Sequence, residues 1–487
     1  MVRRAILRNL PTATPPRGNR IMIIHSAEFK NLHGHLSLAL KFRPDINVLI
    51  GINGTGKTSV LNAIAWILSP TSMHNGFQSA YWLSEFQFDE IRLTYSISDS
   101  TGHQIVCARR FEDHIAISLS GIESGPNIDN KFVIPVVPPP RAPFRERSKY
   151  VERNSDVERN SESIEREVLR QRDNPVLKQL DELQAPLYLP LNRRWMEEWA
   201  GPSSRRYRTR PIQVLTGIPV TEILTLAERA YRSEQAKIAR LNDKLRSDML
   251  VMLFDASQQP FIGTVPSVEE VTARRTAIVD ILDSLDLDDV KTLSEQYFGR
   301  LKEIAAKLGG QELPKDFQTG LHADAWWTWI TEGASFAVRI EQLMHLIENY
   351  QKKRERIARR STSFLQSIND FLHGKKMVFS AEAELKVELP GARLVEGHHL
   401  SSGEMQLLIL FAFLYFQSNH AQQPFVVLVD EPELSLHVAW QHRYVDSVRE
   451  ASPNGQFIIA THSPEITGSV EYEAIIDLGK MAMVPHA

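Results

Sequence analysis

The chain has 487 residues, 43% of them hydrophobic and 24% charged, and its formal net charge is −3. This length allows two or three domains, or one large domain with an insertion, and the composition is that of an ordinary globular protein. The slightly acidic balance does not favour a nucleic-acid-binding protein, although a local basic face is compatible with it. The single cysteine, Cys107, excludes a disulfide framework and a cysteine zinc site.

The first 20 residues include basic residues and prolines but no apolar segment. They lack the pattern of a secretory signal, and we expect residues 1–20 to be a short disordered leader. No stretch approaches the roughly 18 consecutive apolar residues that a membrane span requires. We therefore expect a cytoplasmic protein with no membrane segment.

The next segment has the pattern of several strands around one helix. An apolar run at 46–50 indicates a buried strand, and residues 57–68 then change to helical spacing. Alternating apolar and polar residues predict further strands, some of them in an antiparallel meander. We place these strands at 21–26, 36–42, 91–97, 104–109 and 114–119.

Charged residues dominate the segment 138–182. The sequence Val-Glu-Arg-Asn-Ser occurs at 151–155 and again at 157–161. Between residues 141 and 172 there is too little apolar surface to form a core. We expect either a solvated helix or a disordered insertion, with a regulatory contact segment as the less specific alternative.

A buried-strand pattern returns at 186–191, and three helical stretches follow at about 221–254, 268–307 and 335–373. The first stretch has a seven-residue repeat, which indicates a coiled-coil-like or bundle stripe. Its members are Leu224, Tyr231, Ile238 and Leu245. At ~1.5 Å per residue such helices reach only about 50 Å, so we predict a compact helical insertion over 221–376.

The third helical stretch contains a run of basic residues, namely Lys352, Lys353, Arg354, Arg356, Arg359 and Arg360. A run of this kind is most often a solvated helix face. Contact with a nucleic-acid backbone is the alternative. The sequence leaves both interpretations open.

From residue 377 the chain has the pattern of a compact fold again. It predicts a strand at 386–389, an apolar helix at 405–416, and buried strands at 425–429 and 457–460. The motifs in this part lie more than 300 residues after the first phosphate motif. We therefore expect the two ends of the chain to form one sheet, with the helical region inserted between them.

Residues 51–58 read Gly-Ile-Asn-Gly-Thr-Gly-Lys-Thr and match the Walker A phosphate loop in full, between a predicted strand and a predicted helix. Its glycines let backbone N–H groups surround phosphates at a helix N-terminus. Lys57 would neutralise the β- and γ-phosphates of ATP, and the Thr58 hydroxyl would bind Mg²⁺. The predicted nucleotide-binding residues are Asn53, Gly54, Thr55, Gly56, Lys57, Thr58 and Ser59.

An apolar strand at 426–429 ends in two adjacent acids, as a Walker B motif does. A strand that is buried on both faces has no other evident reason to end in carboxylates. We expect Asp430 to hold Mg²⁺, with Thr58 as the second metal-binding residue, and Glu431 to polarise the attacking water. We therefore predict Glu431 as a catalytic residue.

Residues 400–404 read Leu-Ser-Ser-Gly-Glu and precede an apolar helix. Ser401 or Ser402 can cap this helix, with Glu404 in its first turn. The simple interpretation is a helix cap. The functional one is a motif that resembles the signature of ABC ATPases. That resemblance implies that Ser401, Ser402, Gly403 and Glu404 approach the ATP held by a second copy of the chain.

Two further motifs complete the predicted site. His462 follows the strand at 457–460 and is similar in position to the switch histidine of ABC ATPases, which implies that it contacts the γ-phosphate as a second catalytic residue. Residues 433–437 occupy the position of the D-loop of that family, and the resemblance implies that Ser435 and His437 face the dimer interface. Gln78 and Gln87 are both candidates for the Q-loop glutamine, and we choose neither.

Together these motifs resemble the SMC/RecF/OLD-like branch of the ABC ATPases. The wording at 400–404, 430–437 and 460–464 is most similar to the stand-alone ATPases of anti-phage defence, including the Septu ATPase PtuA, the ATPase subunit of PARIS and the ATPase half of the OLD nucleases. The resemblance covers roughly residues 21–135, 183–200 and 377–475. It implies an α/β ABC ATPase head built from N- and C-terminal parts of the chain, with an inserted helical region.

The expected domains follow from this resemblance. After the leader, residues 21–137 form the N-terminal part of the head, 138–182 the charged insertion, 183–220 the return strand and connection, 221–376 the helical insertion, and 377–487 the C-terminal part of the head. In the signature, Ser402 replaces a glycine and Glu404 replaces a glutamine. The chain ends 25 residues after His462, so we expect no TOPRIM domain, and it has no Cys-x-x-Cys zinc hook.

Three functions remain in view. The resemblance favours an ATP-hydrolysing subunit of a defence complex, a homodimer at least with a higher oligomer as the alternative, which controls a separate nuclease or other effector. The second hypothesis is a RecF-like repair ATPase that binds DNA directly, which the basic run favours and the acidic balance disfavours. A transporter subunit is the third hypothesis, and the architecture disfavours it. In transporter subunits the phosphate loop and the signature lie close together in the chain, without a large helical insertion between them.

Overall fold

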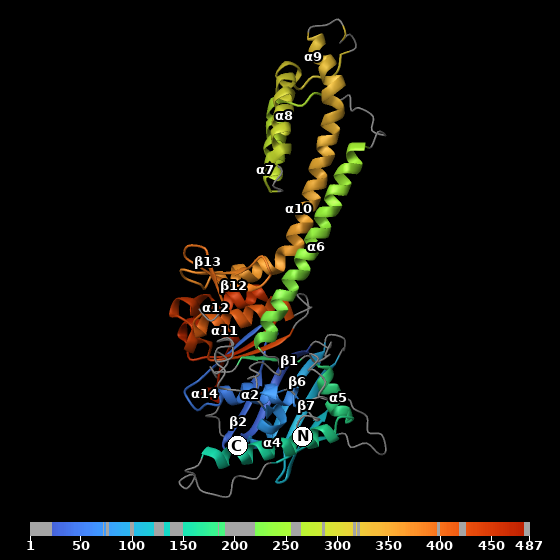
Figure 1. Ribbon diagram of the computed structural model, residues 1–487. Coiled ribbons are helices and arrows are strands. Elements are labelled where there is room, and N and C mark those ends of the chain that lie inside the picture. Colours follow the sequence, from blue (N-terminus) through green and yellow to red (C-terminus); the bar gives the residue numbers. More distant parts are fainter. Residues whose placement is uncertain are drawn as a thin grey trace. The chain divides into compact units, whose positions relative to one another are not determined.

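The computed structural model describes residues 22–71, 73–74, 77–97, 102–120, 131–136, 150–183, 185–189, 220–254, 264–284, 288–314, 318, 322–396, 400–417 and 425–481 (Figure 1). The chain divides into two compact units. The head unit comprises Met1–Ala230 and Arg360–Ala487, and the helical unit comprises Tyr231–Arg359. The predicted leader 1–20 lies outside the described residues.

A parallel sheet forms the centre of the head unit, with strand order β10-β14-β15-β3-β16. The strands are β10 (Leu187–Leu189), β14 (Val426–Asp430), β15 (Gln456–Ala460), β3 (Ile46–Ile50) and β16 (Ile475–Asp477). β3, from the start of the chain, lies between β15 and β16 from its end, with Val48 opposite Ile459. The prediction that the two chain ends share one sheet is therefore confirmed. The strands β14 and β15 are buried along their whole length, which agrees with the apolar runs at 426–429 and 457–460.

A six-stranded antiparallel sheet, in the order β2-β1-β6-β7-β8-β9, forms a second layer. Its strands are β1 (Met22–Leu32), β2 (Leu36–Lys41), β6 (Glu90–Ile97), β7 (His103–Arg110), β8 (His114–Leu119) and β9 (Phe132–Pro135). Helix α2 (Lys57–Leu68) belongs to one apolar cluster with residues of both sheets. This packing fixes the start of α2, and with it the phosphate loop, against the core.

The charged segment is helical where it is described. Helix α4 (Tyr150–Arg170) places Ile164 and Val168 in the core at i and i+4, and α5 (Pro175–Glu182) is capped by Asn174. Of the two alternatives for this segment, the structure has the helix. A few correctly spaced apolar residues attach these helices to the core: Ile164 and Val168 on α4, and Val176, Leu177 and Leu180 on α5.

The other face of the parallel sheet packs on helices α11 (Ser402–Ala412) and α12 (Val438–Ala451). Short strands cover the same region as a separate sheet: β11 (Lys376–Phe379), β12 (Leu385–Leu389) and β13 (Arg393–Val395). A hairpin of β4 (Met73–His74) and β5 (Phe77–Gln78) and the helix α3 (Ser79–Glu85) follow α2. The mixed α/β head built from both ends of the chain, with helices inserted between them, confirms the predicted fold class.

The described part of the inserted region contains the helices α6 (Val220–Phe254), α7 (Val268–Ser284), α8 (Asp288–Leu308), α9 (Ala323–Thr328) and α10 (Ala334–Asn369). The predicted single helix at 268–307 is wrong, because it is two helices packed on each other around Val271, Ile278, Phe298 and Leu301. The predicted heptad stripe divides as well: Leu224 packs in the head core, and Leu245 packs on Ile347 and Tyr350 of α10.

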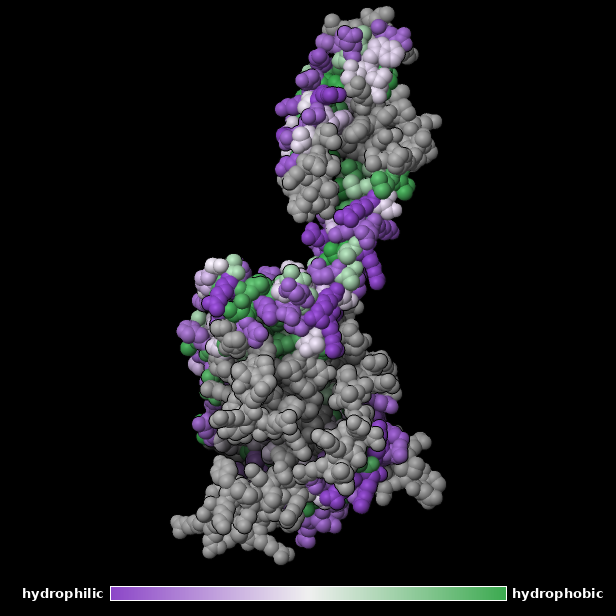
Figure 2. Space-filling view, viewed as in Figure 1, coloured by the Kyte–Doolittle hydropathy of each residue, from purple (hydrophilic) through white to green (hydrophobic). Residues whose placement is uncertain are grey.

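Hydrophilic side chains gather over α6 and α10 (Figure 2). Of the six basic residues predicted as a run, Lys352, Lys353, Arg354, Arg356 and Arg359 are exposed, and Arg360 is partly buried. No helix in the described parts of the chain is long and apolar enough to span a membrane.

Candidate nucleotide-binding site

The phosphate loop follows β3 and depends on glycine at two positions. Gly56, which precedes α2, has a φ of +88°, and a Cβ atom there would lie 2.5 Å from Leu36 Cδ2. Gly51 has a φ of +152°, and a Cβ atom there would lie 2.6 Å from Thr55 Oγ1. Both conformations are rarely adopted by residues with side chains. The loop can therefore bring its backbone N–H groups together at the N-terminus of α2.

Lys57 is buried, with only 5% of its surface exposed, and its ammonium group bridges two sides of the site. Nζ donates to the carbonyl oxygen of Gly51 at 2.9 Å and lies 2.7 Å from Nε2 of His462. Burial lowers the pKa of Lys57, while the nearby carboxylates of Glu431, Asp430 and Glu433 act to raise it. The lysine and His462 are thus held together at the place where a phosphate would need a cation.

Asp430 lies at the end of β14 and is 1% exposed. Its Oδ1 accepts a 3.1 Å hydrogen bond from the Thr58 hydroxyl, and Oδ2 is buried with no hydrogen-bond partner among the described residues. Its pKa is raised to about 7, chiefly by burial and also by the charges of Glu431 and Glu433, against the opposing effects of the Thr58 hydrogen bond and the Lys57 charge. An unpartnered buried carboxylate oxygen next to a hydroxyl is a donor set that suits Mg²⁺, which prefers oxygen ligands and completes its shell with phosphate and water.

Glu431 adopts a left-handed backbone conformation, with a φ of +45°. Such a conformation is uncommon for a residue with a side chain and is often found at functional sites. Its N–H group donates to the carbonyl oxygen of Ala460 at 2.8 Å, which ties the end of β14 to the end of β15. Its carboxylate Oε1 lies 3.7 Å from His462 Nε2. The two predicted catalytic side chains therefore lie together.

A hydrogen-bond network fixes the loop that carries His462. Glu433 Oε1 accepts from the backbone N–H of His462 at 2.5 Å. Gln441 on α12 donates to the carbonyl oxygen of Glu433 and accepts from the Ser463 hydroxyl at 2.6 Å. The network connects the residues after β14 with the residues after β15, so the position of His462 depends on the D-loop segment.

These side chains surround a cavity of about 660 Å³. Most of the predicted nucleotide-binding residues line it, together with Glu431 and His462. The lining residues are His33, Asn53, Gly54, Gly56, Lys57, Thr58, Ser59, Glu431, Leu434 and His462. Thr55 and Asp430 are not among them. The Thr55 hydroxyl donates to the carbonyl oxygen of Ile52, and the Asp430 carboxylate accepts from the hydroxyl of Thr58, which does line the cavity.

The sequence analysis missed His33 and Leu434. His33 lies in the turn between β1 and β2, with a φ of +55°, and its Nε2 is 2.7 Å from the Ser59 hydroxyl. Its ring packs edge-on against Phe86, with ring centroids 4.9 Å apart. The polar turn of residues 33–35 between two strands was the available signal. Of the glutamine candidates, Gln87 accepts a hydrogen bond from the His33 N–H with its backbone carbonyl oxygen and does not line the described cavity, and the side chain of Gln78 lies outside the described residues.

The predicted signature forms the N-terminus of α11, away from the cavity of the same chain. Ser401 is the N-cap, and it forms a capping box with Glu404. Lys375 pairs with the Glu404 carboxylate at 2.8 Å. None of the described cavity-lining residues belongs to α11. The side chains of Ser402 and Ser435 lie outside the described residues, and His437 is exposed and caps α12 through Nδ1.

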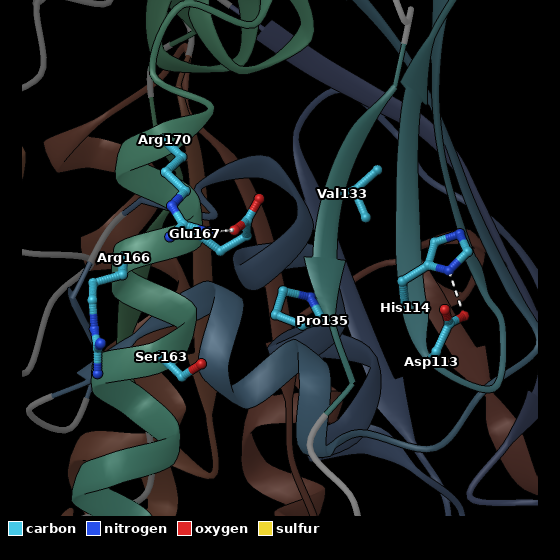
Figure 3. Close-up of a pocket in the computed structure, with 8 residues that line it drawn as sticks. All are labelled: Asp113, His114, Val133, Pro135, Ser163, Arg166, Glu167 and Arg170. Atoms are coloured by element: carbon cyan, nitrogen blue, oxygen red, sulfur yellow. Dashed lines mark hydrogen bonds and ion pairs between the residues drawn. The ribbon is translucent and has the colours of Figure 1, made fainter.

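A second cavity of about 480 Å³ lies between α4 and the strands β8 and β9 (Figure 3). Arg166 and Arg170 line it from the helix, and His114 lines it from β8. Its charges are largely paired within the wall: His114 contacts Asp113 at 2.6 Å, and Arg170 contacts Glu167 at 3.3 Å. The predicted site residues lie elsewhere in the head.

Comparison with known families places the chain among ATPases. A family described as "AAA domain" matches residues 27–369. A second family, described as "AAA domain, putative AbiEii toxin, Type IV TA system", matches residues 331–468. The first match covers most of the chain.

Individual relatives match shorter stretches. The Retron Vc95 probable ATPase of Vibrio cholerae is 29% identical over 149 residues, which are 28% of this chain and 29% of that protein. The Rad50 DNA double-strand break repair ATPase of Methanopyrus kandleri is 43% identical over 53 residues, 11% and 6% of the two chains. The RecF replication and repair protein of Pseudoalteromonas atlantica is 25% identical over 118 residues, 24% and 31% of the two chains. The chain thus matches less than a third of the length of these relatives.

Among solved structures, the Smc head domain with an extended coiled coil from Pyrococcus furiosus, bound to the C-terminal domain of ScpA, is similar over 92% of both chains. The sequence identity is 13% and the TM-score is 0.38. A TM-score of that size carries no argument about function.

Proposed function

The chain belongs to the AAA-domain family, and on that premise we propose that it binds ATP with Mg²⁺ in the 660 Å³ cavity and hydrolyses it between two copies of the chain. The observation that carries this proposal is the convergence of three separate segments on one cavity: Lys57 and Thr58 at the start of α2, Glu431 beside Asp430 at the end of β14, and His462 after β15. The convergence matches the requirements of phosphoryl transfer, which are positioning and charge stabilisation.

Each side chain has a role that its surroundings support. Lys57 leaves its contact with His462 and binds the β- and γ-phosphates. Their negative charge offsets the cost of desolvating the ammonium group, and the attraction is stronger in a partly desolvated site than in water. Thr58 and Asp430 would hold Mg²⁺, which neutralises phosphate charge when bound. Glu431 orients water and accepts its proton, and His462 donates to the γ-phosphate.

The signature supports a site shared by two copies. The N-terminus of α11 lies outside the cavity of its own chain, and a helix N-terminus binds anions. Apolar side chains are exposed on the phosphate loop and the D-loop segment: Ile52 is 75% exposed, Leu434 51% and Val438 53%. Dimerisation would cover these residues, which gives it a hydrophobic contribution in addition to the phosphate contacts.

A substitution in the signature tests this arrangement. Gly403→Asp should place a carboxylate at the phosphate-facing end of α11 and abolish phosphate release, while each monomer still binds ATP. Gly102→Asp introduces the same carboxylate at an exposed position where a Cβ atom would meet nothing within 4 Å. Because Gly403 is buried, a circular dichroism melt like that of the wild type must accompany the result for Gly403→Asp. Unchanged hydrolysis by Gly403→Asp would exclude the shared site.

We further propose that the ATPase serves a bacterial anti-phage defence complex and controls a separately encoded effector, with a nuclease as the expected type. Two relatives are named as probable ATPases of retrons, and the description of one matching family includes a putative toxin of a toxin–antitoxin system. These names support the proposal. Our more specific proposal is a PtuA-like or PARIS-like system, which rests on the amino-acid sequences of the motifs. The test is purification of the tagged protein from its native host, followed by mass spectrometry. A stoichiometric effector-like protein is expected, and its absence would contradict the proposal.

A specific observation favours the alternative of direct DNA binding. The basic residues of α10 from Lys352 to Arg359 are exposed, and the Rad50 and RecF relatives are named for DNA repair. In that case the protein alone would bind duplex DNA with an affinity that falls steeply with salt. Binding that is lost when Lys352, Lys353 and Arg356 are changed to glutamine would favour the repair function over the defence function.

A further inference from the structure

The N-terminus of α11 already contains an anion of its own. The Glu404 carboxylate accepts a hydrogen bond from the backbone N–H of Ser401 at 2.7 Å, and the Ser401 hydroxyl accepts one from the N–H of Glu404. This capping box stabilises the helix, because a carboxylate is favourable at the positive end of the helix dipole. It also places a negative charge at the end of the helix that a phosphate would have to approach.

Lys375 lies against the same carboxylate oxygen. Its Nζ donates to Glu404 Oε2 at 2.8 Å, and the pair is shielded from water, with side-chain exposures of 17% for Lys375 and 8% for Glu404. Charges interact strongly in such a partly desolvated place. The lysine therefore offsets the charge of Glu404 while the carboxylate keeps its capping bonds.

The loop that carries Lys375 is held in place. It joins the end of α10 to β11, and the Asn369 side chain fixes the first residues of that strand. Asn369 Oδ1 accepts from the Met377 N–H at 2.6 Å, and Nδ2 donates to the Met377 carbonyl oxygen at 3.0 Å. A lysine on an anchored loop can reach Glu404 at a lower cost in side-chain entropy than one on a free surface.

We propose that Lys375 is a positioning residue for the ATPase reaction, which keeps the Glu404-containing N-terminus of α11 receptive to the γ-phosphate of ATP bound by a second copy. The inference rests on the proposed function, because it requires the signature to act between two chains. It assigns Lys375 no contact with ATP: the lysine acts only through Glu404.

Charge removal at the two positions tests this role. In the presence of Glu404, Lys375→Met should lower the rate of phosphate release and the ATP-dependent dimer fraction at least tenfold, with ATP binding by the monomer retained. In a Glu404→Gln background, where no carboxylate needs an opposing charge, the same substitution should change both quantities less than twofold. Lys376→Met is the matched control, since Lys376 is the exposed neighbour, and it should behave as the wild type.

The outcomes separate the inference from the proposed function. If Gly403→Asp abolishes hydrolysis but Lys375→Met leaves it intact, the inference is wrong and the shared site stands. An equal loss from Lys375→Met in both backgrounds would also overturn the inference, because the lysine would then act other than through Glu404. Should Lys375→Met alone fail to fold, the doubly substituted chain, which leaves no unpaired buried charge, decides: activity equal to that of Glu404→Gln supports the inference, and a tenfold deficit refutes it.

Discussion

The hydroxyl of Thr58 donates to one oxygen of the Asp430 carboxylate at 3.1 Å, while the other oxygen is buried without a hydrogen-bond partner among the described residues. A buried polar atom that lacks a partner costs free energy in the folded state. The same atom is placed to bind a cation that enters with the nucleotide. The Asp430 carboxyl group therefore affects both the stability of the fold and the binding of a metal ion.

The first prediction concerns the pH dependence of stability. The pKa of Asp430 is raised from 3.8 to about 7. Between these two values the folded state holds a proton on Asp430 that the unfolded state releases. The contribution of Asp430 to the free energy of unfolding is therefore fully present below about pH 4 and is lost as the pH rises towards 7. A shift of about three units corresponds to a loss of at most about 4 kcal/mol.

Asp430→Asn is the control for this effect, because asparagine does not titrate. We expect the melting temperature of the wild type, relative to that of Asp430→Asn, to fall between pH 4.5 and pH 7.5 in the absence of magnesium and nucleotide. Magnesium with ATP should reverse that fall in the wild type only. A temperature difference that is constant across this range would contradict the raised pKa.

The second prediction concerns phosphate binding by Lys57. Lys57→Ala should weaken ATP binding at least about a hundredfold, since it removes a charge-assisted contact in a partly desolvated site. The fold should persist, because burial already disfavours the charged form of this lysine. Titration with a fluorescent ATP analogue measures the binding, and a circular dichroism melt measures the fold. Hydrolysis at the wild-type rate would exclude the phosphate-loop assignment.

The third prediction concerns the junction of the two sheets in the head. Gln456 on β15 is fully buried and bonds both the N–H and the carbonyl oxygen of Ile24 on β1, at 2.8 and 2.7 Å, as well as the carbonyl oxygen of Arg43. Gln456→Ala should destabilise the head by about 2–4 kcal/mol, because it leaves buried backbone groups without partners.

A thermal melt of Gln456→Ala checks this, with Gln366→Ala on the exposed side of α10 as the control. The control should melt within about 1 °C of the wild type, since surface substitutions usually change stability little. A melting temperature for Gln456→Ala that equals that of the control would show that the junction contributes nothing to stability.

Much of the head could be predicted because its motifs constrain both sequence and position. The phosphate loop between β3 and α2, and the acids at the end of β14, have few alternative explanations for a chain with this pattern. The charged segment was harder to interpret. Ile164 and Val168 on α4 are only two apolar residues among many charges. They stabilise the helix only because they pack against the core, which the sequence of the segment itself does not show.

The sequence was least informative about contacts between distant residues of ordinary type. His33 reaches the cavity because the β1–β2 turn is left-handed, and Lys375 reaches Glu404 because α10 ends beside α11. Neither residue belongs to a pattern with a fixed spacing. The division of the 268–307 stretch into α7 and α8 was missed for a related reason, since helical periodicity persists on both sides of the break.

The dimerisation of Glu431→Gln in the presence of ATP and magnesium tests the central proposal most directly. This variant keeps the shape of the site and should lower hydrolysis about 10²–10⁴-fold, the usual range for loss of a general base. Light scattering coupled to size exclusion should show a monomer-sized species without nucleotide and a species of twice that mass with ATP. A variant that binds ATP but keeps the same mass with and without it would contradict a site shared by two copies.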